Sequence, residues 1–545
     1  MRFKLLLVLA FLFLVLIGSF GGVFGQSESF GCVSREDLLD EGNVFDLTNN
    51  IISASEGDIC LTYRFSKAIL PGTINRDVLR ATEIRRDLLL NLIEENPEEA
   101  LTIPEIPENI QNLISESSRK ITKQDSSGDL FEKKGEFTGD LTVAYMDDFE
   151  NQNNTHAEHF ILSEGKQMRM FAAIELPVML SGALIKVNRG LALENKMAVG
   201  TSKENAFNVL SVPPGSPASE NFGEQKTLVI LVNIGEFKFF DSQYVKTIEG
   251  VRDLVFGEQK SNVNDFYIKN SYGQARFVGD VAGVYNLPAD ASVCGWGEVI
   301  TESMKAAIAD GLNVENYDYV AVGSPYFIYE GRYCFEYGGA ASIGDASLDM
   351  DENNYYPDSS DTIKVKASHN PSFEFYVVAH ELGHNLGAMH SNNYLCLGRE
   401  GNLVPFSYEC ENLEYGGQFS IMGGNGHHTA SHKREMGWLS MENIATATEG
   451  VFTLRPQEIS YSSREIQLLR IPVETETSYF VGSDNVYYTV EFKQPIDYDS
   501  QEYYPNYVGG YFDEKLYQGV TIRLVKFNEE GEFTYKGNEI LRVHP

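Results

Sequence analysis

The sequence is poor in basic residues. It contains 43 Lys and Arg against 78 Asp and Glu, which gives a formal net charge of −35. A nucleic-acid partner requires clustered positive side chains that neutralise phosphates, so this composition argues against nucleic-acid binding. The acidity instead favours the solubility of an exported protein.

Long apolar runs are absent apart from one at the N-terminus. Leu5–Ile17 follows the charged residues Arg2 and Lys4 and precedes several glycines. This pattern predicts a signal peptide over residues 1–25, with a retained membrane anchor as the alternative. No later segment reaches the roughly 18–20 apolar residues that span a bilayer. We therefore expect a secreted, extracellular protein without a stable membrane span after signal cleavage.

Cysteine is scarce, and no two cysteines form a C-x-x-C pair. A thiol metal site or a redox motif is therefore poorly supported. The six cysteines are an even number in an exported chain, which favours disulfide bonds. Among the connectivities that six cysteines allow, their order suggests the local pairs Cys32–Cys60, Cys294–Cys334 and Cys396–Cys410.

The stretch from His380 to His390 has the residue types and the spacing of a zinc site. His380 and His384 are four residues apart, so they lie on one face of a helix. Glu381 lies beside the first ligand, where it can act on a water at the metal. Gly387 tolerates a positive φ, which allows a sharp turn that brings His390 back as a third ligand. We expect the fourth position to stay open for water, as in catalytic zinc sites.

These residues carry a resemblance to a known clan of enzymes. The pattern H-E-x-x-H-x-x-G-x-x-H resembles the signature of the metzincin zinc peptidases, in which a methionine turn follows the histidines. Met422, within Ser420-Ile-Met-Gly423, matches that structural Met-turn. No tyrosine follows Met422 closely, so the variant with a tyrosine ligand is not suggested.

Further segments are similar to the gametolysin-like branch of the metzincins. They are Thr227–Asn233, Phe266–Gly279 and His432–Leu439, and the similarity covers about residues 226–440. The branch often has glutamine as its first zinc ligand, whereas this chain has His380. Residues 391–419 form an insertion with two cysteines that does not match the branch.

The resemblance implies an α+β fold, with a metzincin-type catalytic domain built from a twisted mixed sheet and a zinc helix. An N-terminal mixed or β pro-region and a C-terminal β-sandwich would flank it. The expected division is a signal peptide at 1–25, an N-terminal mixed region that could be a propeptide at 26–135, a small β domain at 136–200, a linker at 201–225, the catalytic domain at 226–440 and a C-terminal β domain at 446–545.

Local signals place the elements around the zinc motif. The edge strand over the active-site cleft is expected within Gly338–Ile343. The zinc helix is expected to begin at Asn370 and Pro371, because asparagine is a good cap and proline fits the first helical position.

The expected activity is that of a zinc metalloendopeptidase. Zinc held by His380, His384 and His390 would activate water, and Glu381 would be the general base. Protein or glycoprotein would be the substrate, while specificity and oligomeric state are not readable. The alternative is a surface adhesion or binding protein built on a catalytically inactive metzincin scaffold, but the intact Glu381 argues against it.

Three weaker signals leave alternatives open. His427, His428 and His432 could form a second metal site, but a pocket lining or a helix cap is favoured. The acidic run Asp345–Asp361 could bind Ca²⁺, but it lacks the glycine and the glutamate of a calcium loop, so a solvated loop is favoured. Residues 27 to about 220 could be a propeptide that keeps a zymogen latent. A cysteine could block the zinc, but Cys32 and Cys60 are better explained as disulfide partners.

Overall fold

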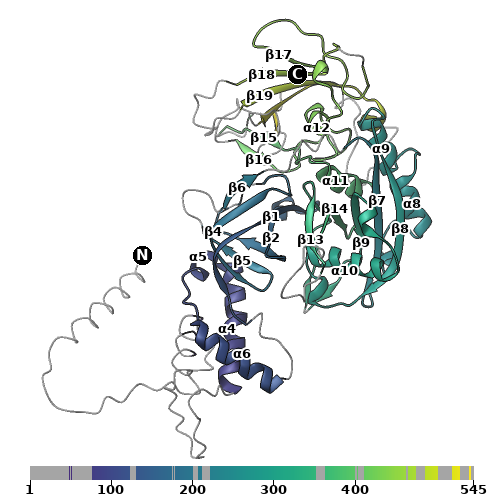
Figure 1. The fold of residues 1–545 in the computed structure, drawn as a ribbon. Helices are drawn as coiled ribbons and strands as arrows, with labels where there is room; N and C mark the ends of the chain where they lie inside the picture. The colour runs from purple at the N-terminus through teal and green to yellow at the C-terminus, as the bar shows by residue number, and fades with distance from the viewer. Residues whose placement is uncertain are drawn as a thin grey trace, which may run out of the picture. The chain divides into compact units, whose positions relative to one another are not determined.

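A computed structural model gives the fold of the chain (Figure 1). It describes residues 76–122, 130–174, 178–200, 207–211, 221–329, 331–350, 362–398, 410–461, 464–473, 485–500, 518–527 and 539–541, and the single residues 44, 48, 51, 176 and 402. The chain divides into two compact units, residues 1–89 with 103–131, and residues 90–102 with 132–545. The predicted signal peptide, the 201–206 and 212–220 parts of the predicted linker, and Cys32 and Cys60 lie outside the described residues.

The first unit contains a packed pair of helices. α4 (Arg76–Glu95) continues into the second unit, and α6 (Glu108–Thr122) follows it in the chain. Their apolar faces share one buried cluster, to which α4 gives Val78 and α6 gives Ile110 and Ile114. A short helix, α5 (Pro97–Ala100), lies between them in sequence and begins with proline, as expected at a first helical turn.

The centre of the second unit is a mixed sheet in which β14, β9, β7 and β8 lie side by side in parallel (Figure 1). Its strands are β7 (Gly223–Ile234), β8 (Ala275–Leu287), β9 (Tyr319–Gly323), β12 (Gly339–Ser342), β13 (Ala346–Asp349) and β14 (Thr362–Asn370). Its helices are α7 (Phe239–Ser242), α8 (Ile248–Phe256), α9 (Val263–Asn270), α10 (Trp296–Ala309) and α11 (Phe375–Asn385). β10 (Ile328–Tyr329) and β11 (Arg332–Tyr333) form a separate hairpin.

Helices cover both faces of this sheet, which explains the uninterrupted apolar run of β7. Leu228 and Ile230 belong to a core with α10 residues such as Val299. Val229 and Leu231 belong to a second core on the opposite face, which includes residues of α8, α9 and α11. Side chains alternate between the faces of a strand, so a strand buried on both faces must be apolar at every position.

A ring of five strands precedes the central sheet in sequence. The pairings β1–β2, β2–β3, β3–β5, β5–β4 and β4–β1 close on themselves, and β6 adds to β4. The strands are β1 (Lys133–Asp147), β2 (His156–Ser163), β3 (Lys166–Phe171), β4 (Leu184–Leu193), β5 (Lys196–Val199) and β6 (Phe207–Ser211). β1 extends past its pairing with β4, and its last four residues pair with β12 while Ala144, Tyr145 and Met146 also stay paired with β2. The ring and the central sheet therefore share one continuous path of hydrogen-bonded strands.

The C-terminal part forms a seven-stranded sheet, ordered β16-β15-β21-β20-β19-β18-β17. The strands are β15 (Asn393–Leu395), β16 (Glu411–Leu413), β17 (Ile444–Thr446), β18 (Leu468–Pro472), β19 (Asn485–Lys493), β20 (Gly519–Phe527) and β21 (Glu539–Leu541). β15 and β16 belong to the insertion at residues 391–419, which does not match the gametolysin-like branch. The insertion joins the C-terminal sheet because β15 pairs with β21. The predicted sandwich and the predicted domain boundaries stay predictions.

Two local predictions near the zinc motif are wrong. β12 is not an edge strand, because β14 pairs with one side of it and β1 with the other. Asn370 and Pro371 do not begin the zinc helix: α11 begins at Phe375, and Asn370 is the last residue of β14, paired with Gly323. A residue before proline favours the extended region, so the dipeptide ends a strand here instead of starting a helix.

We expect Trp296→Ala to destabilise the second unit by about 3–5 kcal/mol, because it removes a large buried side chain. Trp296 is 2% exposed, and its indole N–H donates to the Ala340 carbonyl of β12 at 3.3 Å. Ile308→Ala on the same helix is the control, because Ile308 is 43% exposed. Urea unfolding followed by circular dichroism measures both; equal midpoints for the two variants would contradict the packing described.

Candidate metal centre

The helix α11 positions the first part of the site. It carries His380, Glu381 and His384, all fully buried, and its opposite face packs into the core beneath the central sheet through Val378 and Leu382. The helix ends at Asn385, and Gly387 has a φ of +97°, a conformation that costs glycine little. The amide of Gly387 donates to the His384 carbonyl at 2.8 Å. The chain thereby reverses and returns His390 to the two helical histidines.

All three histidines are held through the same ring nitrogen. Nδ1 of His380 lies 2.9 Å from the Ile421 carbonyl, and Nδ1 of His384 lies 2.7 Å from the Ala388 carbonyl. Nδ1 of His390 lies 2.5 Å from Oε1 of Glu414. These acceptors require the proton on Nδ1, which leaves the lone pair on Nε2 free for a metal.

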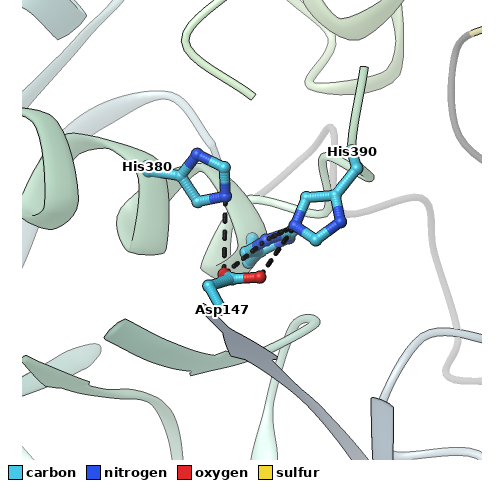
Figure 2. Close-up of side chains that lie close together, drawn as sticks. Asp147, His380 and His390 are labelled. Atoms are coloured by element: carbon cyan, nitrogen blue, oxygen red, sulfur yellow. Dashed lines mark hydrogen bonds and ion pairs between the residues drawn. The ribbon is translucent and has the colours of Figure 1, made fainter. Parts of the chain in front are cut away.

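Asp147, the last residue of β1, lies among the three histidines (Figure 2). Its Oδ2 is 3.4 Å from Nε2 of His380 and 3.3 Å from Nε2 of His384, and its Oδ1 is 3.0 Å from Nε2 of His390. A carboxylate therefore lies where the sequence predicts an open position for water. The shell of three histidines and one water stays a prediction.

The donor set fits a zinc ion. Four ligands at about 2.0–2.2 Å from a tetrahedral zinc lie about 3.3 Å from one another. Four of the separations are close to this value: the Asp147 oxygens lie 3.0 to 3.4 Å from the three Nε2 atoms, and the Nε2 atoms of His384 and His390 lie 3.0 Å apart. All four groups offer ligand atoms within 4.8 Å of one another. Two lone pairs at 3.0 Å repel unless a metal ion or a proton lies between them. Nε2 of His380 and Oδ2 of Asp147 also have no hydrogen-bond partner among the described residues.

Glu381 lies against the sheet beside this cluster. A Cβ built on Gly339 of β12 would approach its Oε1 to 2.2 Å, so only glycine leaves room for the carboxylate. Burial raises the pKa of Glu381 well above its usual value, and the negative charge of Asp147 raises it further. Neither carboxylate oxygen has a hydrogen-bond partner among the described residues. A buried carboxylate of raised pKa is suited to accept a proton.

Met422 lies behind the helix, at the position expected of a Met-turn. It is fully buried, and its Sδ would be 2.5 Å from a Cβ built on Gly383. Its carbonyl accepts from the amide of Ser391, the residue after His390, at 2.9 Å. The turn therefore contacts both the zinc helix and the segment that carries the third histidine.

Three functional residues escaped the sequence reasoning: Asp147, Glu414 and Tyr415. Tyr415 donates to Oδ1 of Asp147 at 2.5 Å, and its ring lies 4.3 Å from that of His390. Glu414 and Tyr415 follow β16 in the unmatched insertion, and Asp147 lies far upstream of the motif. The one sequence signal for Asp147 is its place at the end of an alternating strand pattern, which does not reveal what the strand approaches.

The remaining histidines do not form a second metal centre. Among the described residues the only cluster that could hold a metal is the one above. His427 and His428 precede Thr429, whose hydroxyl caps α12 (Ala430–Glu435) by accepting from the amide of His432. The acidic segment 351–361 lies outside the described residues, and nothing supports a calcium site.

The C-terminal sheet reaches the site through a buried arginine. Arg523 of β20 donates to the hydroxyl of Ser391 at 2.8 Å and to Glu491 of β19 at 3.1 Å. Glu491 in turn accepts from the amide of Ala430 at 2.6 Å. Both charged side chains are nearly unexposed, so each satisfies the other in a dry environment. The sheet therefore fixes the residue that follows His390.

The two disulfide bonds within the described residues are Cys294–Cys334 and Cys396–Cys410, as predicted. The second lies within the insertion that supplies Glu414 and Tyr415. The described part of the chain contains no helix long and apolar enough to cross a membrane.

Comparison with known families supports the metal centre. Residues 285–391 match the model of the family described as Metallo-peptidase family M12B Reprolysin-like. The matched segment runs from β8 to just beyond His390, so it contains all three histidines and Glu381. It supports a metallopeptidase of the metzincin type, while the gametolysin-like branch stays a prediction. No curated protein matches the chain.

We expect Glu414→Ala to weaken zinc binding by about 10- to 100-fold, because the partner that orients the ring of His390 is lost. Competition with a chromogenic chelator measures this affinity. Glu411→Ala is the matched control, since Glu411 is exposed on the neighbouring β16. Equal affinities for the two variants would show that Glu414 does not position His390.

Proposed function

We propose that this protein is a secreted zinc-dependent endopeptidase. One observation carries the proposal: three buried histidines, each held at Nδ1, direct their Nε2 atoms to one point, with a buried carboxylate beside them. Three imidazoles without a fourth obligatory ligand are typical of catalytic zinc sites, whereas structural sites are closed by cysteines.

The roles of the residues follow from their positions. His380, His384 and His390 would hold the ion. When bound, zinc would supply Lewis acidity that lowers the pKa of a water molecule and polarises the scissile carbonyl. Glu381 accepts the proton of that water and transfers it to the nitrogen of the leaving amine.

The proposed substrate is an extracellular protein or glycoprotein. The charged start and apolar run at residues 2–17 support export, and two disulfide bonds within the described residues agree with an oxidising compartment. The similarity to the gametolysin-like branch favours cell-wall or matrix glycoproteins.

We expect Glu381→Ala to retain zinc and to lower casein cleavage by about 10²–10⁴-fold, since the general base is removed. His380→Ala should lose both the metal and the activity. The assay uses the full chain before and after limited trypsin treatment, with trypsin then inhibited, because Asp147 lies at the metal site. Zinc content is measured in parallel.

Glu374→Ala, at the start of the same helix, is the matched control, because Glu374 makes no capping hydrogen bond there. Cleavage should stop when a chelator is added and resume when zinc is restored. Chelator-insensitive cleavage, or full activity of Glu381→Ala, would refute the proposed mechanism. No cleavage by any form would favour a binding protein on an inactive scaffold.

A further inference from the structure

The end of β1 and the bend after it bring three residues to the zinc histidines. The ring of Tyr145 stacks on His384 with centroids 4.9 Å apart and lies 4.4 Å from the ring of His390. Asp147 approaches all three Nε2 atoms (Figure 2). Phe149 contacts the ring of His380 edge-on, with centroids 5.1 Å apart. Alternate residues of a strand share one face, so Tyr145 and Asp147 place one face of β1 against the metal site.

The same segment occupies the free side of β12. It runs antiparallel to β12, with Met146 opposite Ala340 and Asp147 opposite Gly339. The amide of Gly338 donates to the Asp147 carbonyl at 2.7 Å. An extended peptide adds to a sheet by this same pairing. Glu381 also lies against Gly339. Asp147 is therefore close to β12, to Glu381 and to the three histidines.

We propose that Asp147 is a fourth, inhibitory ligand of the metal and that β1 holds the place of a substrate strand, which keeps the chain latent. This inference rests on the proposed function. With Asp147 bound, the metal has four protein ligands and no position for water. Activation then requires β1 to withdraw from β12. The four described cysteines are paired, so none of them is the blocking ligand in this proposal.

The surroundings hold the carboxylate in place. Tyr415 donates to its Oδ1, and the Tyr415 oxygen also lies 3.0 Å from the hydroxyl of Thr155. Asp148 then turns the chain away from the site by accepting from the amides of Glu150 and Asn151. Asp147, Glu381 and the three histidines are each at most 1% exposed. A substrate cannot reach them while β1 is paired.

β1 and a substrate compete for the same site, and β1 has the advantage because it belongs to the same chain as the site. A segment joined to its binding site acts at an effective concentration in the millimolar range, whereas peptidase substrates bind with KM values of about 1 μM to 1 mM. The open form is then a minor state of roughly 0.1–10%. Removing the Asp147 carboxylate should therefore raise the apparent affinity for a metal-binding probe by about 10- to 1000-fold.

The test compares Asp147→Ala and Asp147→Asn with Asp140→Asn in the full chain. Asp140 lies on the same strand, but its carboxylate pairs with Lys364 instead of the histidines. Asp147→Asn keeps the shape of the side chain, so it separates loss of the ligand from loss of folding. Circular dichroism confirms that each variant is folded.

Three readouts are taken: the visible spectrum of the Co²⁺-substituted protein, titration with acetohydroxamate, and casein cleavage. We expect both Asp147 variants to change the cobalt spectrum, to bind acetohydroxamate more tightly, and to cleave casein at least about tenfold faster. Asp140→Asn should match the wild type in all three.

Each outcome decides a separate point. An unchanged cobalt spectrum in both Asp147 variants would overturn Asp147 as a ligand. A changed spectrum with cleavage no faster than that of an active wild type would overturn latency. A changed spectrum and tighter acetohydroxamate binding with no cleavage by any form would support Asp147 as the inhibitory ligand while refuting the peptidase function.

Discussion

The structure depends on the convergence of three imidazole nitrogens on one point. Each ring is fixed by an acceptor at Nδ1, two of them backbone carbonyls and the third the carboxylate of Glu414. Nε2 atoms 3.0 Å apart are unfavourable without a metal ion or a proton between them. Packing and hydrogen bonds around the rings hold this arrangement in place.

Much of the fold can be understood as support for that convergence. The parallel sheet and its helices fix α11, Gly387 reverses the chain, and Met422 closes the core behind the helix. Arg523 links the C-terminal sheet to Ser391 beside the third ligand. The C-terminal sheet thus contributes to the site without supplying a ligand, which gives a physical reason for its attachment to the catalytic region.

Local chemistry could be predicted from sequence, but contacts between distant segments could not. The zinc helix could be predicted from the spacing of His380 and His384, and the buried strand β7 from its apolar run. Both features depend on residues that are neighbours in the sequence. Asp147 arrives from a strand more than two hundred positions upstream. Its pairing with β12 also explains why a predicted edge strand is internal. No local pattern specifies which strand covers an open edge.

In the intact chain we expect one zinc ion to join the three histidines to Asp147. A crystal structure of the full chain, with anomalous data at the zinc edge, would show this. We expect one strong peak within about 2.0–2.2 Å of the three Nε2 atoms and of an Asp147 oxygen. A peak at the histidines with water in place of Asp147 would contradict latency, and a peak elsewhere would contradict the metal site itself.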